Sequence, residues 1–158
     1  MIHINVICVG KLKEAYLKDA INEYAKRLSK YCKINIVEVP DEPIPSNLND
    51  KLSESIKQAE GNKILSFVKN SYVISLDLKG KQYTSEEFSD KLEKLSLNNS
   101  SISFIIGGSL GLSNEVINKS NELICFSKMT FPHQLIRLFL LEQIFRAFKI
   151  SNNETYHG

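Results

Sequence analysis

The sequence predicts an α/β fold in which helices cover both faces of a mainly parallel sheet. Short runs rich in β-branched residues recur along the chain, as buried strands do. Segments with apolar residues at helical spacing separate most of these runs. The 158 residues contain no internal repeat or low-complexity stretch, so we expect one domain over residues 1–158.

The composition is that of a soluble globular protein, with 42% hydrophobic and 24% charged residues. A formal net charge of +2 neither indicates nor excludes a nucleic-acid partner. The cysteines Cys8, Cys32 and Cys125 lack zinc-ligand spacing, which favours buried thiols and no metal. No apolar run approaches the roughly 18 to 20 residues of a membrane span, so we expect a cytoplasmic protein without a membrane partner.

The first part of the chain alternates between the two element types. Residues 2–9 form the first expected strand, which ends at Gly10, and residues 13–29 form the first expected helix. A second strand at 34–39 ends at Pro40. The proline-rich segment after it should be an extended loop, because proline cannot join a sheet ladder through its nitrogen.

A second helix and a third strand follow. The apolar residues of 48–59 have helical spacing, and we expect this helix to be interrupted near Gly61. Residues 72–78 form the third strand, with Gly80 in the turn after it. Residues 84–87, T-S-E-E, have the sequence of a capping box, whose side chains satisfy free amides at a helix start.

The last part of the chain predicts a strand at 102–106, a short helix capped by Ser113, a strand at 123–126 and a long helix at 133–150. In the long helix, eleven of the sixteen positions in 135–150 are apolar, and they encircle it. A helix that is apolar all round needs burial on more than one side, which favours a homodimer with two-fold symmetry. The alternative is a monomer whose charged helix positions face solvent.

Two loops are candidates for ligand binding. Residues 107–113, G-G-S-L-G-L-S, follow a buried strand, and their glycines either let a ligand approach the backbone or serve a tight turn. The loop is not a P-loop, and it lies too late in the chain for a typical dinucleotide fold. Residues 126–133, F-S-K-M-T-F-P-H, either line a pocket at the carboxyl edge of the sheet or supply turn and cap residues.

The polar tail, residues 152–158, has two interpretations. It is either a frayed terminus, or Tyr156 and His157 stack on a base and exchange a proton. His133 lies at the start of the long helix, inside the second loop. It is therefore better placed for chemistry than His3, which lies on the first strand.

With residues 107–111, 127–134 and 156–157, the sequence resembles the bacterial ribosomal RNA large subunit methyltransferase H family, a minimal group of SPOUT methyltransferases. The resemblance covers the whole chain and includes V-G-K-L-K at 9–13 and R-A-F-K-I at 146–150. It implies a homodimer, a C-terminal trefoil knot and S-adenosyl-L-methionine as cofactor. It further implies methylation of N3 of a pseudouridine in 23S rRNA of the assembled ribosome, with no DNA partner.

The resemblance also assigns site residues. Carried over position by position, the cofactor contacts are Leu76, Gly108, Ser127, Lys128, Met129, Thr130, Phe131 and Pro132. For catalysis, we expect His157 and Tyr156 to position the base or transfer its proton. His133 is the second candidate base, and Arg137 is the candidate to offset charge on the base oxygens.

The tail departs from the family pattern at Thr155 and Gly158, where a proline and a basic residue are usual. These changes predict a looser tail and a weaker phosphate contact. Two other functions stay open: a related knotted methyltransferase acting on tRNA or another rRNA base, and a dimeric binding module without catalysis. Activity on isolated tRNA would favour the first, and failure to bind S-adenosyl-L-methionine the second.

Overall fold

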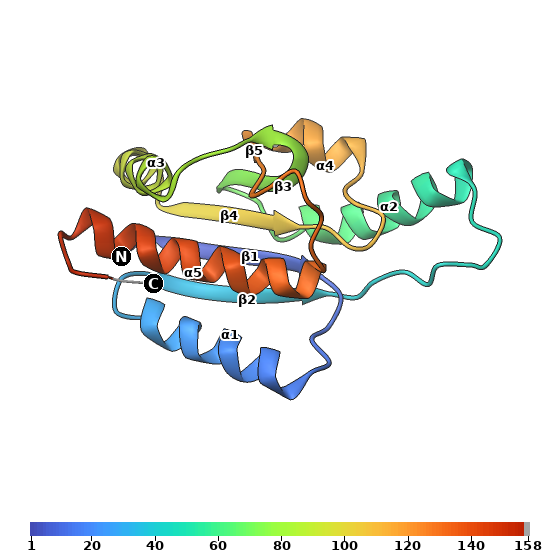
Figure 1. The fold of residues 1–158 in the computed structure, drawn as a ribbon. Coiled ribbons are helices and arrows are strands. Elements are labelled where there is room, and N and C mark those ends of the chain that lie inside the picture. The colour runs from blue at the N-terminus through green and yellow to red at the C-terminus, as the bar shows by residue number, and fades with distance from the viewer. Residues whose placement is uncertain (157–158) are drawn as a thin grey trace.

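Five parallel strands form one sheet in the computed structural model, which describes residues 1–156 (Figure 1). In chain order the strands are β1 (His3–Val9), β2 (Lys33–Val39), β3 (Tyr72–Lys81), β4 (Ser101–Ile106) and β5 (Glu122–Ile124). Their order in the sheet is β2-β1-β4-β3-β5, and every neighbouring pair runs parallel. The carboxyl ends of the strands therefore meet at one edge, where open α/β sheets bind ligands.

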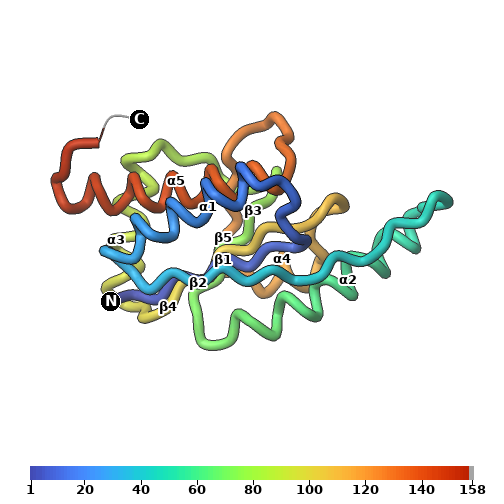
Figure 2. Tube along the Cα trace, turned by 90° about the horizontal axis from the view of Figure 1, so that it is seen from below, coloured from blue at the N-terminus to red at the C-terminus, as the bar shows by residue number. Residues whose placement is uncertain are grey.

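Helices cover both faces of this sheet, which confirms the predicted fold class. One face carries α1 (Ala15–Leu28), α3 (Ser85–Asn98) and α5 (His133–Ser151), with α5 packed against both of the others (Figures 1 and 2). The opposite face carries α2 (Asp50–Leu65) and α4 (Asn114–Lys119). Among residues 1–156, none of the helices has the length and apolar character needed to cross a membrane.

The side-chain alternation of β1 divides the interior into two cores. Ile4, Val6 and Cys8 lie in the core beneath α1, α3 and α5. Ile7 and Val9 belong to the smaller core beneath α2 and α4. Successive strand residues point to opposite faces of a sheet, so one strand supplies both layers.

The predicted caps are confirmed. Thr84 Oγ1 accepts a hydrogen bond of 3.0 Å from the Glu87 N–H, and Glu87 Oε1 accepts one of 2.8 Å from the Thr84 N–H. This reciprocal capping box begins α3. Ser113 caps α4 with its side chain alone, because its Oγ accepts a hydrogen bond of 3.2 Å from the Val116 N–H.

Two glycine assignments from the sequence were wrong, because both glycines serve close packing. Helix α2 continues past Gly61 to Leu65, and a Cβ at Gly61 would lie 2.6 Å from Ser113 Oγ, so the glycine lets α2 pack closely on α4. Strand β3 continues through Gly80 to Lys81. A Cβ at Gly80 would lie 2.5 to 2.7 Å from backbone atoms of Ile124, so β5 could not approach any larger residue.

The three cysteines are buried and unpaired, as the sequence predicts. Burial raises the pKa of Cys8 and of Cys32 to about 12. These two thiols therefore stay protonated and act as small apolar side chains.

Candidate active site

A cavity of about 470 Å³ opens at the carboxyl edge of the sheet, beyond the ends of β3, β4 and β5. Its walls come from the end of β3, from the glycine loop after β4 and from the loop that connects β5 to α5. Apolar residues such as Ile106, Leu112 and Ile136 alternate in its lining with backbone and polar side chains. A cavity of this size and character is typical of small-molecule and cofactor sites.

Most of the cofactor contacts inferred from the sequence line this one cavity, although they come from three separate segments. The lining includes Leu76, Gly108, Ser127, Met129, Thr130 and Phe131. Lys128 and Pro132 belong to the same loop but are not among the described residues that line the cavity. The topology of the sheet, which sets β3 between β4 and β5, brings these segments together.

Internal hydrogen bonds shape the two loops. Gly108 and Gly111 form an isolated antiparallel bridge, and the Gly111 N–H donates to the Gly108 carbonyl at 3.0 Å. In the loop before α5, Ser127 Oγ accepts a hydrogen bond of 3.1 Å from the Met129 N–H. The Ser127 carbonyl in turn accepts one from the Cys125 thiol at 3.0 Å. Both loops therefore contain turn hydrogen bonds and also line the cavity, while the approach of a ligand to their backbone stays a prediction.

His133 is the predicted catalytic residue that lines the cavity. It is the first residue of α5, and it is half-buried. Burial lowers the pKa of its imidazole below the ordinary value of 6.5, and the nearby positive charge of Arg137 lowers it further. The imidazole is therefore neutral at pH 7 and able to accept a proton.

Arg137 lies one turn further along α5, but its guanidinium is buried and only 1% of the residue is exposed. Its Nη1 donates to Glu38 Oε2 at 2.7 Å, and its Nη2 donates to the Gly10 carbonyl at 3.3 Å. Within residues 1–156, its Nε is the one buried side-chain nitrogen or oxygen without a hydrogen-bond partner. Arg137 is thus engaged with β2 and with the loop after β1, and it does not line the cavity.

Tyr156 lies away from the cavity of its own chain. Its hydroxyl donates to Glu142 Oε2 at 2.7 Å, and the Arg146 guanidinium lies 4.5 Å from the centre of its ring. Glu142 follows His133 by nine residues, which is about 13 Å along a helix. His157, the leading catalytic candidate from the sequence, lies outside the described residues.

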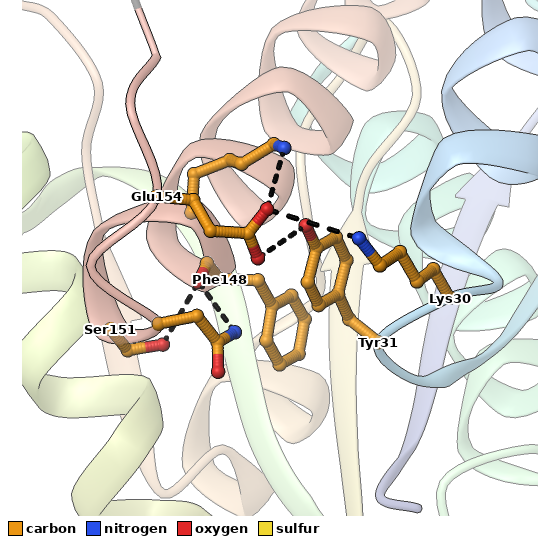
Figure 3. Close-up of polar contacts among 7 residues, drawn as sticks. Lys30, Tyr31, Phe148, Ser151 and Glu154 are labelled. Atoms are coloured by element: carbon orange, nitrogen blue, oxygen red, sulfur yellow. Dashed lines mark hydrogen bonds and ion pairs between the residues drawn. The ribbon is translucent and has the colours of Figure 1, made fainter.

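The segment before Tyr156 is fixed to α5 and to the end of α1 through Glu154 (Figure 3). Its carboxylate accepts hydrogen bonds of 2.9 Å from both the Tyr31 hydroxyl and Lys149 Nζ. Asn153 adopts a left-handed backbone conformation with φ of 54°, which turns the chain back onto the helix. The tail up to residue 156 is therefore held by Glu154 although Thr155 stands where a proline is usual.

Sequence reasoning missed several residues of the cavity. Lys57 comes from α2 and Asn114 from the start of α4, on the face of the sheet opposite α5. Asp77 and Lys79 extend β3 beyond Leu76 into the lining. Asp77 could have been predicted as a site residue, because it lies at the end of an apolar strand. Nothing in the local sequence around Lys57 indicates a site.

Residues 2–157 match the family described as "Predicted SPOUT methyltransferase". The chain belongs to the SPOUT methyltransferase family. Membership implies a methyl donor as co-substrate, and the trefoil knot of the SPOUT fold in the C-terminal half of the chain. The parallel sheet and the cavity formed by loops that follow its strands agree with this assignment.

Similar proteins extend the match across almost the whole SPOUT chain. It is 60% identical over 157 residues to "Ribosomal RNA large subunit methyltransferase H" of Clostridium acetobutylicum, covering 98% of this chain and 99% of the relative. A protein of the same name from Clostridium botulinum strain Alaska E43 is also 60% identical, with the same coverage. Over most of its length, the chain therefore aligns with these relatives residue by residue.

Solved structures support the fold alone. The "Probable Methyltransferase" of Bordetella pertussis superposes with a TM-score of 0.58 at 9% identity, covering 91% of this chain and 93% of that one. A "probable methylase family protein" of Haemophilus influenzae gives a TM-score of 0.54 at 16% identity, covering 99% of this chain and 70% of that one. These proteins thus share the fold of this chain although little sequence identity remains.

Proposed function

We propose that this SPOUT protein transfers a methyl group from S-adenosyl-L-methionine to N3 of a pseudouridine in 23S rRNA of the assembled ribosome. The observation that carries the proposal is the 60% identity, over 98% of the chain, to relatives named ribosomal RNA large subunit methyltransferase H. The cavity supports it, because six of the eight inferred cofactor positions lie in one lining. Under this proposal the protein works in the cytoplasm, where ribosomes are assembled.

The cavity fits a cofactor of this kind. Its volume of about 470 Å³ lies within the usual range of roughly 300 to 1,000 Å³ for small-molecule sites. Leu76, Met129 and Phe131 offer apolar surface, and Gly108 adds a residue without a side chain to the lining. A Cβ at Gly108 would lie 3.0 Å from the Val9 side chain, so a larger residue would be crowded there. Bound there, S-adenosyl-L-methionine would supply a methyl group already activated by a positively charged sulfur.

The protein must then align the target nitrogen and remove its proton. His133 can accept this proton, since it borders the cavity and is neutral at pH 7. Tyr156 and His157 remain the proposed residues for holding the base. The burial of Arg137 favours a supporting role for its guanidinium over direct contact with the base oxygens.

We propose a homodimer, and the surface around the cavity supports it. Leu78, Met129, Phe131 and Phe139 are between 39% and 74% exposed, and the rings of Phe131 and Phe139 pack edge to face at 5.7 Å. Exposed apolar side chains grouped beside a ligand site are typical of a protein interface. We propose that a second copy covers them, and that the tail of each chain, at the far end of α5, serves the cavity of its partner (Figure 1).

Transfer of labelled methyl groups from S-adenosyl-L-methionine tests this function directly. Purified ribosomes and isolated tRNA, both from a bacterium that lacks a methyltransferase of this family, are offered in parallel. The proposal predicts label in 23S rRNA of the ribosomes and none in tRNA. Label in tRNA alone would favour a tRNA methyltransferase, and failure to bind the cofactor would favour a binding module without catalysis.

A further inference from the structure

The loop that joins β1 to α1 carries two lysines that the proposed reaction does not use. Lys11 and Lys13 are both exposed, and neither forms an ion pair within residues 1–156. The loop lies beside the start of α5, at the same edge of the sheet as the cavity (Figures 1 and 2). Two lysines on a flexible loop would bind an anion only weakly. Whether Lys11 and Lys13 can form a binding site therefore depends on how firmly the loop backbone is held.

Four hydrogen bonds with residues of β2 and α5 hold the loop backbone. The Gly10 N–H donates to the Val39 carbonyl at 2.7 Å, and the Gly10 carbonyl accepts from Arg137 Nη2 at 3.3 Å. The Leu12 N–H donates to Glu38 Oε2 at 2.9 Å. Gln134 Nε2, on α5, donates to the Lys11 carbonyl at 3.4 Å. Strand β2 and helix α5 thus hold the loop backbone, while the side chains of Lys11 and Lys13 form no ion pair within residues 1–156. The charge of Lys11 acts on the Glu38 carboxylate from a longer distance.

The Arg137–Glu38 ion pair also neutralises a negative charge next to the loop. Glu38 is the carboxylate bound to the loop backbone, and its side chain is 37% exposed. Burial opposes its ionisation, but the hydrogen bonds from Arg137 and from Leu12 outweigh that effect and lower the pKa of Glu38. The carboxylate is therefore ionised and neutralised by Arg137, so it offers little repulsion to an approaching anion.

The loop borders the proposed site through His133. A Cβ at Gly10 would lie 3.7 Å from His133 Nε2, and His133 lines the cavity. Lys128 is exposed on the loop before α5, and Lys79 lies in the cavity wall, so other segments near the cavity also carry cations. A nucleotide whose base approaches a cofactor bound in the cavity would bring its flanking phosphates to this edge of the sheet, and lysine is a common partner of phosphate.

We infer that Lys11 and Lys13 form a fixed platform that binds RNA phosphates next to the target nucleotide, with Arg137 and Glu38 as its positioning residues. The inference rests on the proposed function for the identity of the partner. The platform contributes affinity and orientation without reading sequence, because phosphates are the same at every nucleotide. Glu14 is exposed at the end of the loop, and its negative charge weakens the positive potential of the two lysines. Removing that charge should therefore affect RNA binding in the opposite direction to removing the lysines.

Binding to ribosomes at several salt concentrations tests the platform. The double variant Lys11→Gln/Lys13→Gln is compared with Lys33→Gln/Lys69→Gln, which removes two exposed lysines at the amino edge of the sheet. Co-sedimentation with bacterial ribosomes measures the affinity, and calorimetry with S-adenosyl-L-methionine checks that the cavity is intact. Each lost phosphate contact should reduce the slope of log affinity against log salt by about 0.7 to 0.9.

We expect the first double variant to bind ribosomes at least roughly tenfold more weakly at low salt, with a reduced slope, while the control behaves as wild type. Glu14→Gln should bind as well as wild type or better. Equal slopes for wild type and the Lys11/Lys13 variant, or an equal loss in the control, would overturn the inference. This assay measures binding and not methyl transfer. Its result can therefore be interpreted even if the proposed reaction is not observed.

Discussion

The Tyr156 hydroxyl donates a hydrogen bond of 2.7 Å to Glu142 Oε2, near the middle of α5 and away from the cavity at its first turn. Tyr156 also packs edge to face on Phe145, with 5.3 Å between the ring centres. The tail is thus docked on its own helix while its proposed target lies elsewhere. This separation is the physical reason for assigning the tail of one chain to the cavity of a second.

Loss of the Glu154 carboxylate should release the tail. In Glu154→Gln the charged contacts with Lys149 and Lys30 disappear, and the hydrogen bond from Tyr31 weakens. Amide exchange over residues 152–156 should then accelerate by roughly fivefold, the factor for about one lost hydrogen bond. Methyl transfer should slow through kcat, with the affinity for S-adenosyl-L-methionine unchanged.

The matched control for this experiment is Glu23→Gln, which removes an exposed pair with Arg27 on α1. That variant should leave both tail exchange and kcat as in wild type. An unchanged kcat in Glu154→Gln, with faster exchange in the tail, would show that the position of the tail does not matter for the reaction.

The pH dependence of methyl transfer should report His133. Its pKa is below 6.5 in the folded protein, so most of the imidazole is neutral at pH 7 and the neutral fraction falls as the solution becomes more acidic. The rate constant kcat/KM should decline with a midpoint below pH 6.5. His133→Gln should abolish this decline and lower the rate by roughly 10²- to 10⁴-fold, the usual contribution of a general base. A variant that keeps the acidic midpoint would assign the titration to another group.

Glu38→Gln should destabilise the protein by about 2 kcal/mol, because it leaves the buried Arg137 charge without its partner. This figure lies below the roughly 3 to 5 kcal/mol usual for a broken buried pair, because Glu38 is 37% exposed and water partly replaces it. Urea unfolding at pH 7 measures the difference. A loss below about 0.5 kcal/mol would mean that solvent already screens the pair.

The same pair predicts a pH-dependent stability. The pKa of Glu38 is lower in the folded protein than its ordinary value of 4.5, so the stabilisation is complete above pH 4.5. It is lost as the pH falls through the lowered value and the folded carboxylate takes up a proton. The stabilities of wild type and Glu38→Gln should therefore converge in strongly acidic solution. A constant difference down to that pH would contradict the assignment of the shift to Glu38.

Gly80→Ala should separate β3 from β5, since the added Cβ would meet the backbone of Ile124 at 2.5 Å. Overpacking of this kind costs about 1 to 3 kcal/mol. Because β5 leads directly into the cavity loop, the variant should also bind S-adenosyl-L-methionine more weakly. Thermal unfolding with and without cofactor measures both effects, and wild-type behaviour in both would contradict the packing argument.

Local patterns were enough to predict most of the fold. The apolar strands and the helical spacings correspond to the observed elements, and the capping box at Thr84 and the cap at Ser113 depend on side chains a few residues apart. Gly61 and Gly80 were misassigned because each is explained by a partner distant in sequence, Ser113 and Ile124 respectively. A glycine that permits close packing cannot be told from one that forms a turn by its neighbours in the chain.

The candidate site was predictable where a motif identified it and not elsewhere. The loop containing Ser127 and Thr130 could be assigned by resemblance, and it lines the cavity. Lys57 could not be assigned from the sequence, because its place in the cavity depends on α2 reaching the cavity from the other face of the sheet. The engagement of Arg137 with Glu38 depends on residues 99 positions apart, and no pattern within α5 predicts it.

The most direct test of the central claim is the identity of the modified nucleoside. Ribosomes from a bacterium without this activity are incubated with S-adenosyl-L-methionine and either wild type or His157→Ala, and nucleosides of the 23S rRNA are then analysed by mass spectrometry. The proposal predicts a pseudouridine methylated at N3 with wild type and little of it with the variant. Wild-type enzyme that binds the cofactor but leaves every 23S rRNA pseudouridine unmethylated would contradict the proposed substrate.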